Sequence, residues 1–204
     1  MSRNQMKSRT RRQDFESDTD DAPLPVMVPR SDRTLAPTPP ERVRRLRKHL
    51  IVTLRALRTT KPPKRPPSPP RPEPEGFAGR VAATACGLCK GWCCKNGEDD
   101  AFLDEQTLLR VRRATPALNA RTILHLFLDR VPPDTYQGSC IFHGKQGCTL
   151  DRSLRSDVCN TYFCGGLQNY LAGGDTTTPA VIFAGEGSKM RTSPILTPKR
   201  EPVP

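Results

Sequence analysis

The chain has 204 residues and a mass of 22.7 kDa, with 35% hydrophobic residues, 5% aromatic residues and 22 prolines. This composition excludes one core that extends through the whole chain, and it excludes both a membrane-spanning protein and a large α/β enzyme. The formal net charge of +12 favours acidic partners, and the eight cysteines favour a metal site.

The basic start of the chain is polar throughout, and it is not followed by the apolar stretch that is typical of a secretory signal. The acidic side chains among residues 14–21 argue against a transit peptide. No segment approaches the ~20 apolar residues that a membrane-spanning helix needs. We therefore expect a cytoplasmic protein without a transmembrane segment. Its thiols would stay reduced, and clustered cysteines would more often bind metal than form disulfides.

Residues 1–76 are expected to be a disordered, basic, proline-rich arm. Residues 1–75 hold 14 of the 22 prolines, and 18 Lys and Arg against 9 Asp and Glu. The stretch 61–75 is expected to be an extended polyproline-type spacer. Residues 41–58 have apolar side chains at helical spacing, namely Val43, Leu46, Leu50, Leu54 and Leu57. The favoured interpretation is a transient amphipathic helix, and the alternative is a basic helix that binds an anionic membrane surface or nucleic acid.

Residues 77–174 contain every cysteine and are expected to form the folded cysteine-cluster domain. The sequence predicts a first helix over 101–113, capped by Asp99 or Asp100, and a second over 116–130. Residues 140–150 predict two short strands joined by a tight loop at 144–147, and residues 161–171 predict a third short helix. Residues 175–204 are expected to be a tail with a hairpin at 180–192 and a frayed end. The predicted fold class is a small, helix-rich α+β domain stapled by metal.

The cysteines fall into two dense groups, with spacings C-x2-C-x3-C-C and C-x7-C-x10-C-x4-C. Two cysteines separated by two residues can reach one ion because the loop between them is short. If residues 86–94 were helical, the first three cysteines would share one face and the fourth would point elsewhere. Three thiolates of the first group and one of the second would complete a four-sulfur shell, and the rest would form a second site or pack as small apolar groups. The candidate metal ligands are Cys86, Cys89, Cys93, Cys94, Cys140, Cys148, Cys159 and Cys164.

Thiolate ligands suit Zn²⁺, Cu⁺ and iron–sulfur clusters, and the spacing does not choose between zinc and iron. A domain of this size with few large apolar side chains would gain stability from a metal staple. The alternative is a scaffold of four disulfides, which a reducing compartment disfavours. A nucleophilic cysteine is less expected, because no Cys–His–Asp set stands out.

Three segments, CGLCKGWCC at 86–94, CIFHGKQGC at 140–148 and RSDVCNTYFC at 155–164, resemble the motif of the YkgJ-like cysteine-cluster family of zinc- or iron-chelating domains. The resemblance covers residues 84–171, and all eight cysteines fall on motif positions. Ser156 and Asn160 stand where the family usually has proline and arginine. The family includes flagellin lysine N-methylase-like proteins, so the resemblance implies that such a cluster can serve an enzyme. For this chain, the resemblance implies metal binding at the cysteines and identifies no catalytic residue.

Other side chains near the cysteines have simpler interpretations. We interpret His143 as a turn residue rather than a nitrogen ligand, and Trp92 as a cover over the metal loop. Arg152 and Arg155 are expected to offset thiolate charge, since a four-thiolate zinc shell is net negative. Arg110 is interpreted as part of a solvated face.

The leading hypothesis is a metal-binding protein that chelates zinc, iron or an iron–sulfur cluster through clustered cysteine thiolates. Two alternatives stay open. One is an iron–sulfur-dependent group-transfer enzyme of the flagellin lysine N-methylase type. The other is a zinc-stapled nucleic-acid-binding protein that uses the basic arm.

Overall fold

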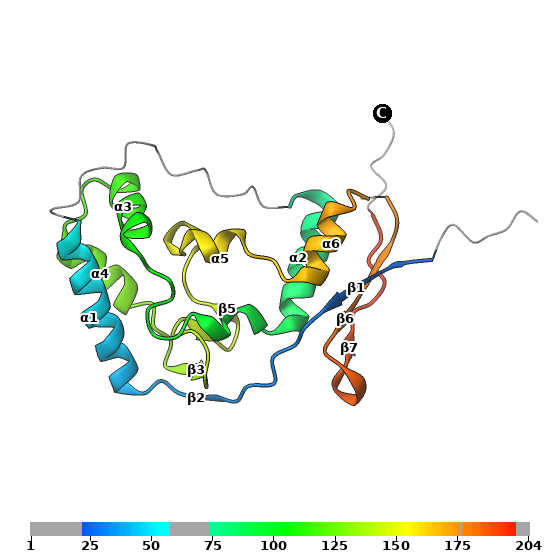
Figure 1. Ribbon diagram of the computed structural model, residues 1–204, viewed down its shortest axis with the longest axis horizontal. Coiled ribbons are helices and arrows are strands. Elements are labelled where there is room, and N and C mark those ends of the chain that lie inside the picture. Colours follow the sequence, from blue (N-terminus) through cyan, green and yellow to red (C-terminus); the bar gives the residue numbers. More distant parts are fainter. Residues whose placement is uncertain (1–21, 58–73, 176, 199–204) are drawn as a thin grey trace, which may run out of the picture.

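A computed structural model describes residues 22–57, 74–175 and 177–198 of the chain. Its elements form two lobes, with the cysteine-bearing loops between them (Figure 1). The helical lobe contains α1 (Pro40–Ala56), α3 (Glu105–Ala114) and α4 (Ala120–Leu128). The sheet lobe contains β1 (Leu24–Val28), α2 (Gly76–Cys89), α6 (Gly165–Ala172), β6 (Ala180–Ala184) and β7 (Arg191–Thr192). Each lobe has its own hydrophobic core.

The apolar stripe of α1 is buried in the helical lobe. Leu46 and Leu50 are fully buried, where α1 packs against α3 and α4. The partner helices supply matching apolar side chains, including Leu108, Ile123 and Phe127. A proline at the first helical position is well tolerated there, because the first N–H groups of a helix have no partner within it. The helix is thus held by tertiary packing rather than by its own propensity.

The expected disordered arm is therefore wrong for residues 22–57. The helix predicted at 41–58 forms as α1, yet it is a core element of the fold rather than a transient one. Upstream of it, β1 lies in the core of the sheet lobe and β2 (Leu35–Pro37) pairs with β3 (Asp134–Tyr136). The parts of the expected arm at 1–21 and 58–73, including most of the proline-rich spacer, lie outside the described residues.

The other helix boundaries of the helical lobe also differ from prediction. Asp104, not Asp99 or Asp100, caps α3, and its carboxylate accepts a hydrogen bond from the Thr107 N–H at 2.8 Å. Asp99 instead accepts hydrogen bonds from the side chains of Arg42 and Arg45 on α1.

Helix α4 likewise starts later than predicted. It begins at Ala120 and is capped by Asn119, rather than starting at Thr115-Pro116. The competing caps were equally plausible from sequence, so spatial neighbours decided between them.

The sheet lobe is built from segments at opposite ends of the described chain. Strand β1 pairs in parallel with β6, with Leu24 opposite Ala180, and β7 pairs antiparallel on the other side of β6. Alternate residues of β6 are fully buried, namely Ala180, Ile182 and Ala184, and α2 and α6 pack on the sheet. The approach of α6 to β1 is so close that a Cβ at Gly166 would lie 1.6 Å from the Met27 carbonyl oxygen.

Residues 177–198 are therefore part of the fold rather than a tail, and the fold is not confined to residues 77–174. The predicted hairpin at 180–192 is confirmed as β6 and β7, with a short 3₁₀ helix, η3 (Gly187–Lys189), between them. The expected frayed end is wrong for residues 193–198, because Leu196 forms a β-bridge with Ala180. Residues 199–204 lie outside the described part.

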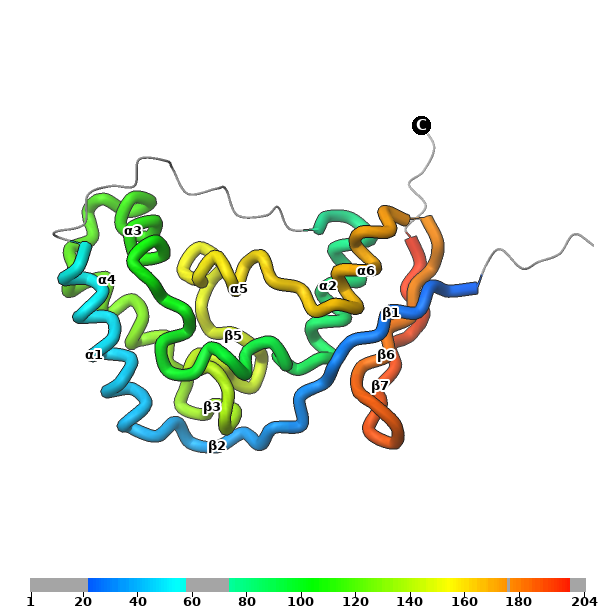
Figure 2. Tube along the Cα trace, viewed as in Figure 1, coloured from blue at the N-terminus to red at the C-terminus, as the bar shows by residue number. Residues whose placement is uncertain are grey.

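Short elements fill the space between the lobes, and Figure 2 traces their path. The tight hairpin predicted near 144–147 is confirmed as β4 (His143–Gly144) and β5 (Gly147–Cys148). The third predicted helix is divided into α5 (Asp157–Thr161) and α6. Two 3₁₀ helices complete the region, η1 (Trp92–Asn96) and η2 (Arg152–Leu154). The fold class is thus mixed α+β. No described helix is both long and apolar enough to cross a membrane.

Candidate metal centre

A left-handed turn follows the first two cysteines. Helix α2 ends at Cys89, and the next residues, Lys90 and Gly91, have φ angles of 51° and 65°. Left-handed residues terminate a right-handed helix, so residues 86–94 are helical only as far as Cys89. The chain then enters η1, which carries Cys93 and Cys94. The turn, rather than a shared helix face, brings Cys93 back toward Cys89.

Backbone N–H groups point at three of the sulfurs, those of Cys89, Cys93 and Cys140. The N–H groups of Trp92 and Gly91 donate hydrogen bonds to the sulfur of Cys89. The N–H of Phe142 does the same for Cys140. Such donors favour the anionic thiolate over the neutral thiol. Sequence reasoning missed these donors, although Gly91 is a signal for the left-handed turn that aims two of them.

His143 packs against this turn. A Cβ at Gly91 would lie 2.5 Å from the His143 Nε2 and Cε1 atoms, so only glycine allows the imidazole to sit there. The His143 Nδ1 atom lies 2.8 Å from the Ser139 hydroxyl oxygen, and the Tyr136 ring lies 4.6 Å away between centroids. Burial, and secondarily the charge of Arg33, lowers the pKa of His143 to about 4, so the imidazole is neutral at neutral pH. This packing agrees with the interpretation of His143 as a structural residue.

The two cysteine groups meet through the main chain. The Cys140 N–H donates to the Cys94 carbonyl oxygen at 3.0 Å, and the Gly97 N–H donates to the same oxygen at 3.1 Å. A Cβ at Gly97 would lie 3.1 Å from the Cys140 sulfur, which shows how closely the segments approach. Cys148 follows on β5, directly opposite His143 in the hairpin register. Distant parts of the sequence therefore converge at this point.

Cys159 and Cys164 are presented by two helix starts. Cys159 lies in α5, where the capping Ser156 hydroxyl accepts a hydrogen bond from the Cys159 N–H at 3.3 Å, and Cys164 is the N-cap residue of α6. The buried Asn160 amide donates to the Arg152 carbonyl oxygen at 2.9 Å. Both departures from the family motif, Ser156 and Asn160, thus have structural roles here.

The thiols influence one another's ionisation. Burial, followed by the charges of Cys93, Cys89 and Cys164, raises the pKa of Cys86 to about 11. Cys86 has exposed surface, yet the surrounding protein still desolvates its sulfur. Burial, followed by the charges of Cys148 and Cys159, raises the pKa of Cys140 to about 12. Gathering these sulfurs as thiolates is therefore unfavourable unless a cation offsets their charge.

The adjacent pair Cys93 and Cys94 behaves differently. A hydrogen bond from the Cys94 thiol lowers the pKa of Cys93 to about 7, and the same bond raises the pKa of Cys94. The charges of Cys140 and Cys148 act on Cys94 in the same direction. When the pair carries a single proton, that proton therefore stays on Cys94, and the exposed Cys93 is the thiolate.

Arginine side chains lie near the cysteines, as expected for Arg152 and Arg155. The charge of Arg152 favours the thiolate of Cys86, and that of Arg155 favours the thiolate of Cys159. Arg110 is not part of a solvated face. It hydrogen-bonds the Ser153 and Arg155 carbonyl oxygens and lies 3.3 Å from the Asp157 carboxylate. These contacts join α3 to the segment that carries Cys159.

Trp92 is half-buried next to the first cysteine group. It packs against the core of the sheet lobe, and the Lys95 ammonium lies 4.5 Å from its ring centroid. Its position in η1, between Cys89 and Cys93, matches its expected place beside the cysteine loop. Whether the ring shields a metal stays a prediction.

All eight cysteines are free, so the disulfide alternative finds no pairing in this structure. Within the described residues, no three His, Cys, Asp or Glu side chains are spaced to hold one metal ion. The chemistry of the donor set fits zinc or iron, since it consists of soft thiols, N–H donors to sulfur and nearby cations. Ligation would require the sulfurs to draw together from their present spacing.

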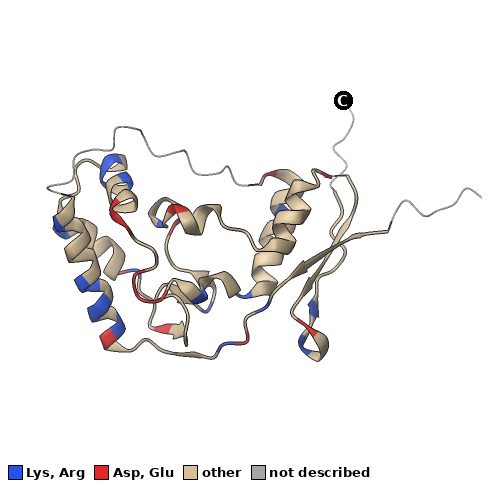
Figure 3. Ribbon diagram, viewed as in Figure 1, with Lys and Arg blue, Asp and Glu red and all other residues tan. Residues whose placement is uncertain are grey.

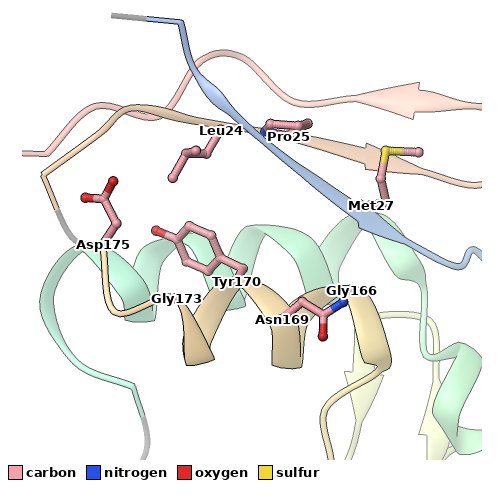
Figure 4. A pocket seen from close by; sticks show the side chains of 8 residues that line it. All are labelled: Leu24, Pro25, Met27, Gly166, Asn169, Tyr170, Gly173 and Asp175. Carbon is pink, nitrogen blue, oxygen red and sulfur yellow. The ribbon is translucent and has the colours of Figure 1, made fainter. Parts of the chain in front are cut away.

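A separate pocket of about 350 Å³ lies between α6 and β1 (Figure 4). Its lining is mainly apolar and includes Leu24, Met27 and Tyr170. The Asp175 carboxylate at its rim already accepts hydrogen bonds from Thr177 and Thr178. The lining contains none of the eight cysteines, so the pocket and the thiols do not form one site.

Comparison of the chain with known protein families, with curated proteins and with solved structures finds no match. The resemblance to the YkgJ-like family therefore rests on the cysteine spacing.

Proposed function

We propose that this protein binds a thiophilic metal, zinc or iron, through its clustered cysteine thiolates. The observation that carries the proposal is the direct contact between two distant cysteine segments, where the Cys140 N–H donates to the Cys94 carbonyl oxygen at 3.0 Å. Six further free thiols lie on the elements around this contact. Soft sulfur ligands select zinc, copper(I) and iron–sulfur clusters over hard cations.

The surrounding groups support binding of an anionic sulfur cluster to a cation. Hydrogen bonds from Gly91 and Trp92 to the Cys89 sulfur lower the cost of forming a thiolate. Arg152 and Arg155 reduce the net negative charge that several thiolates would create. A bound cation would supply the positive charge that offsets the mutual repulsion of the thiols. Because most of these thiols are neutral at neutral pH, binding would release protons and weaken as the pH falls.

The proposal is tested by elemental analysis of the full chain. The protein is produced in medium containing both zinc and iron and is purified without oxygen. We expect at least one equivalent of zinc or iron per chain, with a brown colour if the metal is an iron–sulfur cluster. Cys89→Ser should lower the metal content. The matched control is Gly87→Ser on the same helix, where an added Cβ meets nothing within 4 Å and the metal content should stay unchanged.

Two results would count against metal binding. One is wild-type protein without zinc or iron that also fails to take up added zinc under reducing conditions. The other is a Cys89→Ser variant with wild-type metal content and wild-type thermal stability.

A second candidate function, zinc-stapled nucleic-acid binding, is supported by the outer face of α1. Basic residues recur along α1, as the colouring of the ribbon in Figure 3 shows, and several of them are exposed. Arg45 is held by Asp99, and Arg44 forms an exposed ion pair with Glu41 at 3.9 Å. Basic side chains in such a row bind phosphates with a strong dependence on salt. The exposed basic residues of α1 are Arg44, Arg45, Arg47, Lys48 and Arg55.

This second candidate is tested by binding of duplex and single-stranded DNA and RNA across a salt series. Replacing Arg44, Arg47 and Lys48 by alanine should weaken binding and lower the log–log salt slope by about 0.7–0.9 for each lost phosphate contact. Lys145→Ala, at the exposed turn between β4 and β5, is the control. An unchanged slope in the triple variant would exclude α1 as the interface.

A further inference from the structure

Five of the eight cysteines belong to, or pack against, one of the two hydrophobic cores. Cys89 belongs to the core of the sheet lobe, and Cys164 packs against that core. Cys140 belongs to the core of the helical lobe, and Cys94 and Cys148 pack against it. No cysteine packs in both cores. Since each core fixes the backbone positions of the cysteines packed in it, these five cysteines are anchored in two separate groups.

Three thiols are carried by elements of the sheet lobe, and a fourth, Cys93, lies on η1 directly after α2. Cys86 and Cys89 lie one turn apart on α2, and Cys164 caps α6, which packs against α2. The left-handed turn after Cys89 directs Cys93 back toward that helix. Electrostatic interactions connect Cys86 with the other three members of the set. We call Cys86, Cys89, Cys93 and Cys164 the sheet-lobe thiols.

The other four thiols are carried by segments attached to the helical lobe. The Cys140 N–H donates to the Cys94 carbonyl oxygen, and Cys148 lies on the hairpin that continues from Cys140. Cys159 lies on α5, which the 3.3 Å contact between Arg110 and Asp157 joins to α3. Electrostatic interactions connect Cys140 with Cys148 and Cys159, and Cys94 with Cys140 and Cys148. We call Cys94, Cys140, Cys148 and Cys159 the helical-lobe thiols.

The boundary between the sets passes between Cys93 and Cys94. Cys93 acts electrostatically on Cys86 and Cys89, whereas Cys94 is affected by Cys140 and Cys148. The two sets are also close to each other, because the side chains of Cys93 and Cys94 hydrogen-bond and Cys93 affects Cys159. Arg152 lies beside Cys86 of the sheet-lobe thiols, whereas the helical-lobe thiols have Arg155 beside Cys159 and Arg42 beside Cys140.

We infer that the eight cysteines form two neighbouring four-thiolate metal centres, one anchored to each lobe, rather than one centre with four spare thiols. The inference rests on the proposed metal-binding function. A four-sulfur shell is the complete set of ligands for structural zinc, and two sets of four account for all eight thiols. The sulfurs of each set would draw together on binding, since no three of them are spaced to hold one ion in the structure as described. The backbone between Cys93 and Cys94 connects the two centres.

The inference is tested on the full chain loaded with zinc, by zinc stoichiometry and by mapping which cysteines an alkylating reagent modifies. Wild-type protein should hold two zinc ions per chain, with all eight thiols protected. Cys164→Ser should lose one zinc and expose only the remaining sheet-lobe thiols. Cys148→Ser should also lose one zinc and expose only the remaining helical-lobe thiols. Both positions are only partly buried, so serine there leaves the cores intact.

The neighbouring variants Cys93→Ser and Cys94→Ser form the most discriminating pair. They differ by one position in the chain, yet the first should expose sheet-lobe thiols and the second helical-lobe thiols.

One zinc per chain in the wild type would overturn the two-centre inference while leaving metal binding intact. A single variant that exposes thiols of both sets would also overturn it, because that is the behaviour of one shared cluster. A wild type that binds no zinc would overturn both the inference and the proposed function.

Discussion

The two lobes differ in how they are held together. Of the twelve largest fully buried side chains, eight belong to the helical lobe, including Phe127 and Phe142. The sheet lobe contributes four, namely Val26, Val81, Leu167 and Ile182, and much of its remaining core consists of alanines. Since burial of large apolar side chains is the main stabilising contribution, the sheet lobe has less of its own. If the proposed metal binds, the comparison predicts that its contribution to stability is larger in the sheet lobe, where the hydrophobic core is smaller.

Chain topology widens this difference. In the helical lobe, α3 ends at Ala114 and α4 begins at Ala120, and α1 ends at Ala56 while α3 begins at Glu105. The central strand pair of the sheet lobe joins more distant parts of the chain, residue 24 to residue 180. Closing so long a loop costs conformational entropy before any contact is gained. The sheet lobe therefore has both the smaller core and the larger entropic cost of assembly.

Metal removal should have the largest effect and should reveal the difference directly. Structural zinc contributes about 10–16 kcal/mol of binding free energy in small zinc-dependent domains, and that energy is available for folding. On chelation we expect amide hydrogen exchange to accelerate most in α2, α6 and β6, while the buried face of α1 keeps more of its protection. Equal loss of protection in both lobes, or no loss, would contradict the comparison.

Truncation of a core aromatic side chain should destabilise the helical lobe next most strongly. Phe127 is fully buried, so Phe127→Ala should cost about 3–5 kcal/mol through lost burial and the cavity left behind. Phe102→Ala removes the same atoms at a position with 36% exposure and is the matched control, with a much smaller effect. Chemical denaturation of both variants measures the difference, and similar losses would show that the core is not centred on Phe127.

The helical lobe was the more predictable from sequence, because its signals are local. The leucines of residues 41–58 recur at helical spacing. The sequence alone does not identify the side chains of α3 and α4 that bury them. Strand β1 carries no comparable signal, since LPVMV is short, lies among prolines, and gains its partner from the other end of the chain. Helix α2 was missed because Gly76, Gly79 and Gly87 weaken a helical pattern that tertiary contacts with β6 stabilise.

The candidate site shows the same division. The identity and grouping of the cysteines could be read from their spacing, as could the nearby arginines. The left-handed turn at Lys90 and Gly91, and the partition of the thiols between two lobes, depend on backbone geometry and on long-range packing. Both lie beyond what periodicity and spacing determine.

A backbone contact in the sheet lobe should come third in size. A Cβ at Gly166 would meet the Met27 carbonyl oxygen at 1.6 Å, and neither backbone can yield without separating α6 from β1. Gly166→Ala should therefore cost at least about 3 kcal/mol, at the upper end of overpacking effects. Gly165→Ala, where nothing lies within 4 Å, is the adjacent control and should be neutral or slightly stabilising. If both variants unfold at the wild-type denaturant concentration, the close contact does not hold the lobe together.

The junction between the lobes should respond to pH through His143. Its folded-state pKa, about 4, lies below the ordinary value of 6.5, because burial and then Arg33 disfavour the charged ring. The unfolded chain therefore binds this proton more readily, so the stabilisation is present above pH 6.5 and is lost as the pH falls toward 4. We expect a loss of about 2–3 kcal/mol over that window.

Denaturation of wild type and His143→Asn at several pH values isolates the histidine, since other acidic groups and any acid-induced metal loss affect both proteins alike. The variant should be less stable at neutral pH and show a shallower decline in acid. Parallel pH profiles for the two proteins would mean that the ring does not resist protonation where it packs on Gly91.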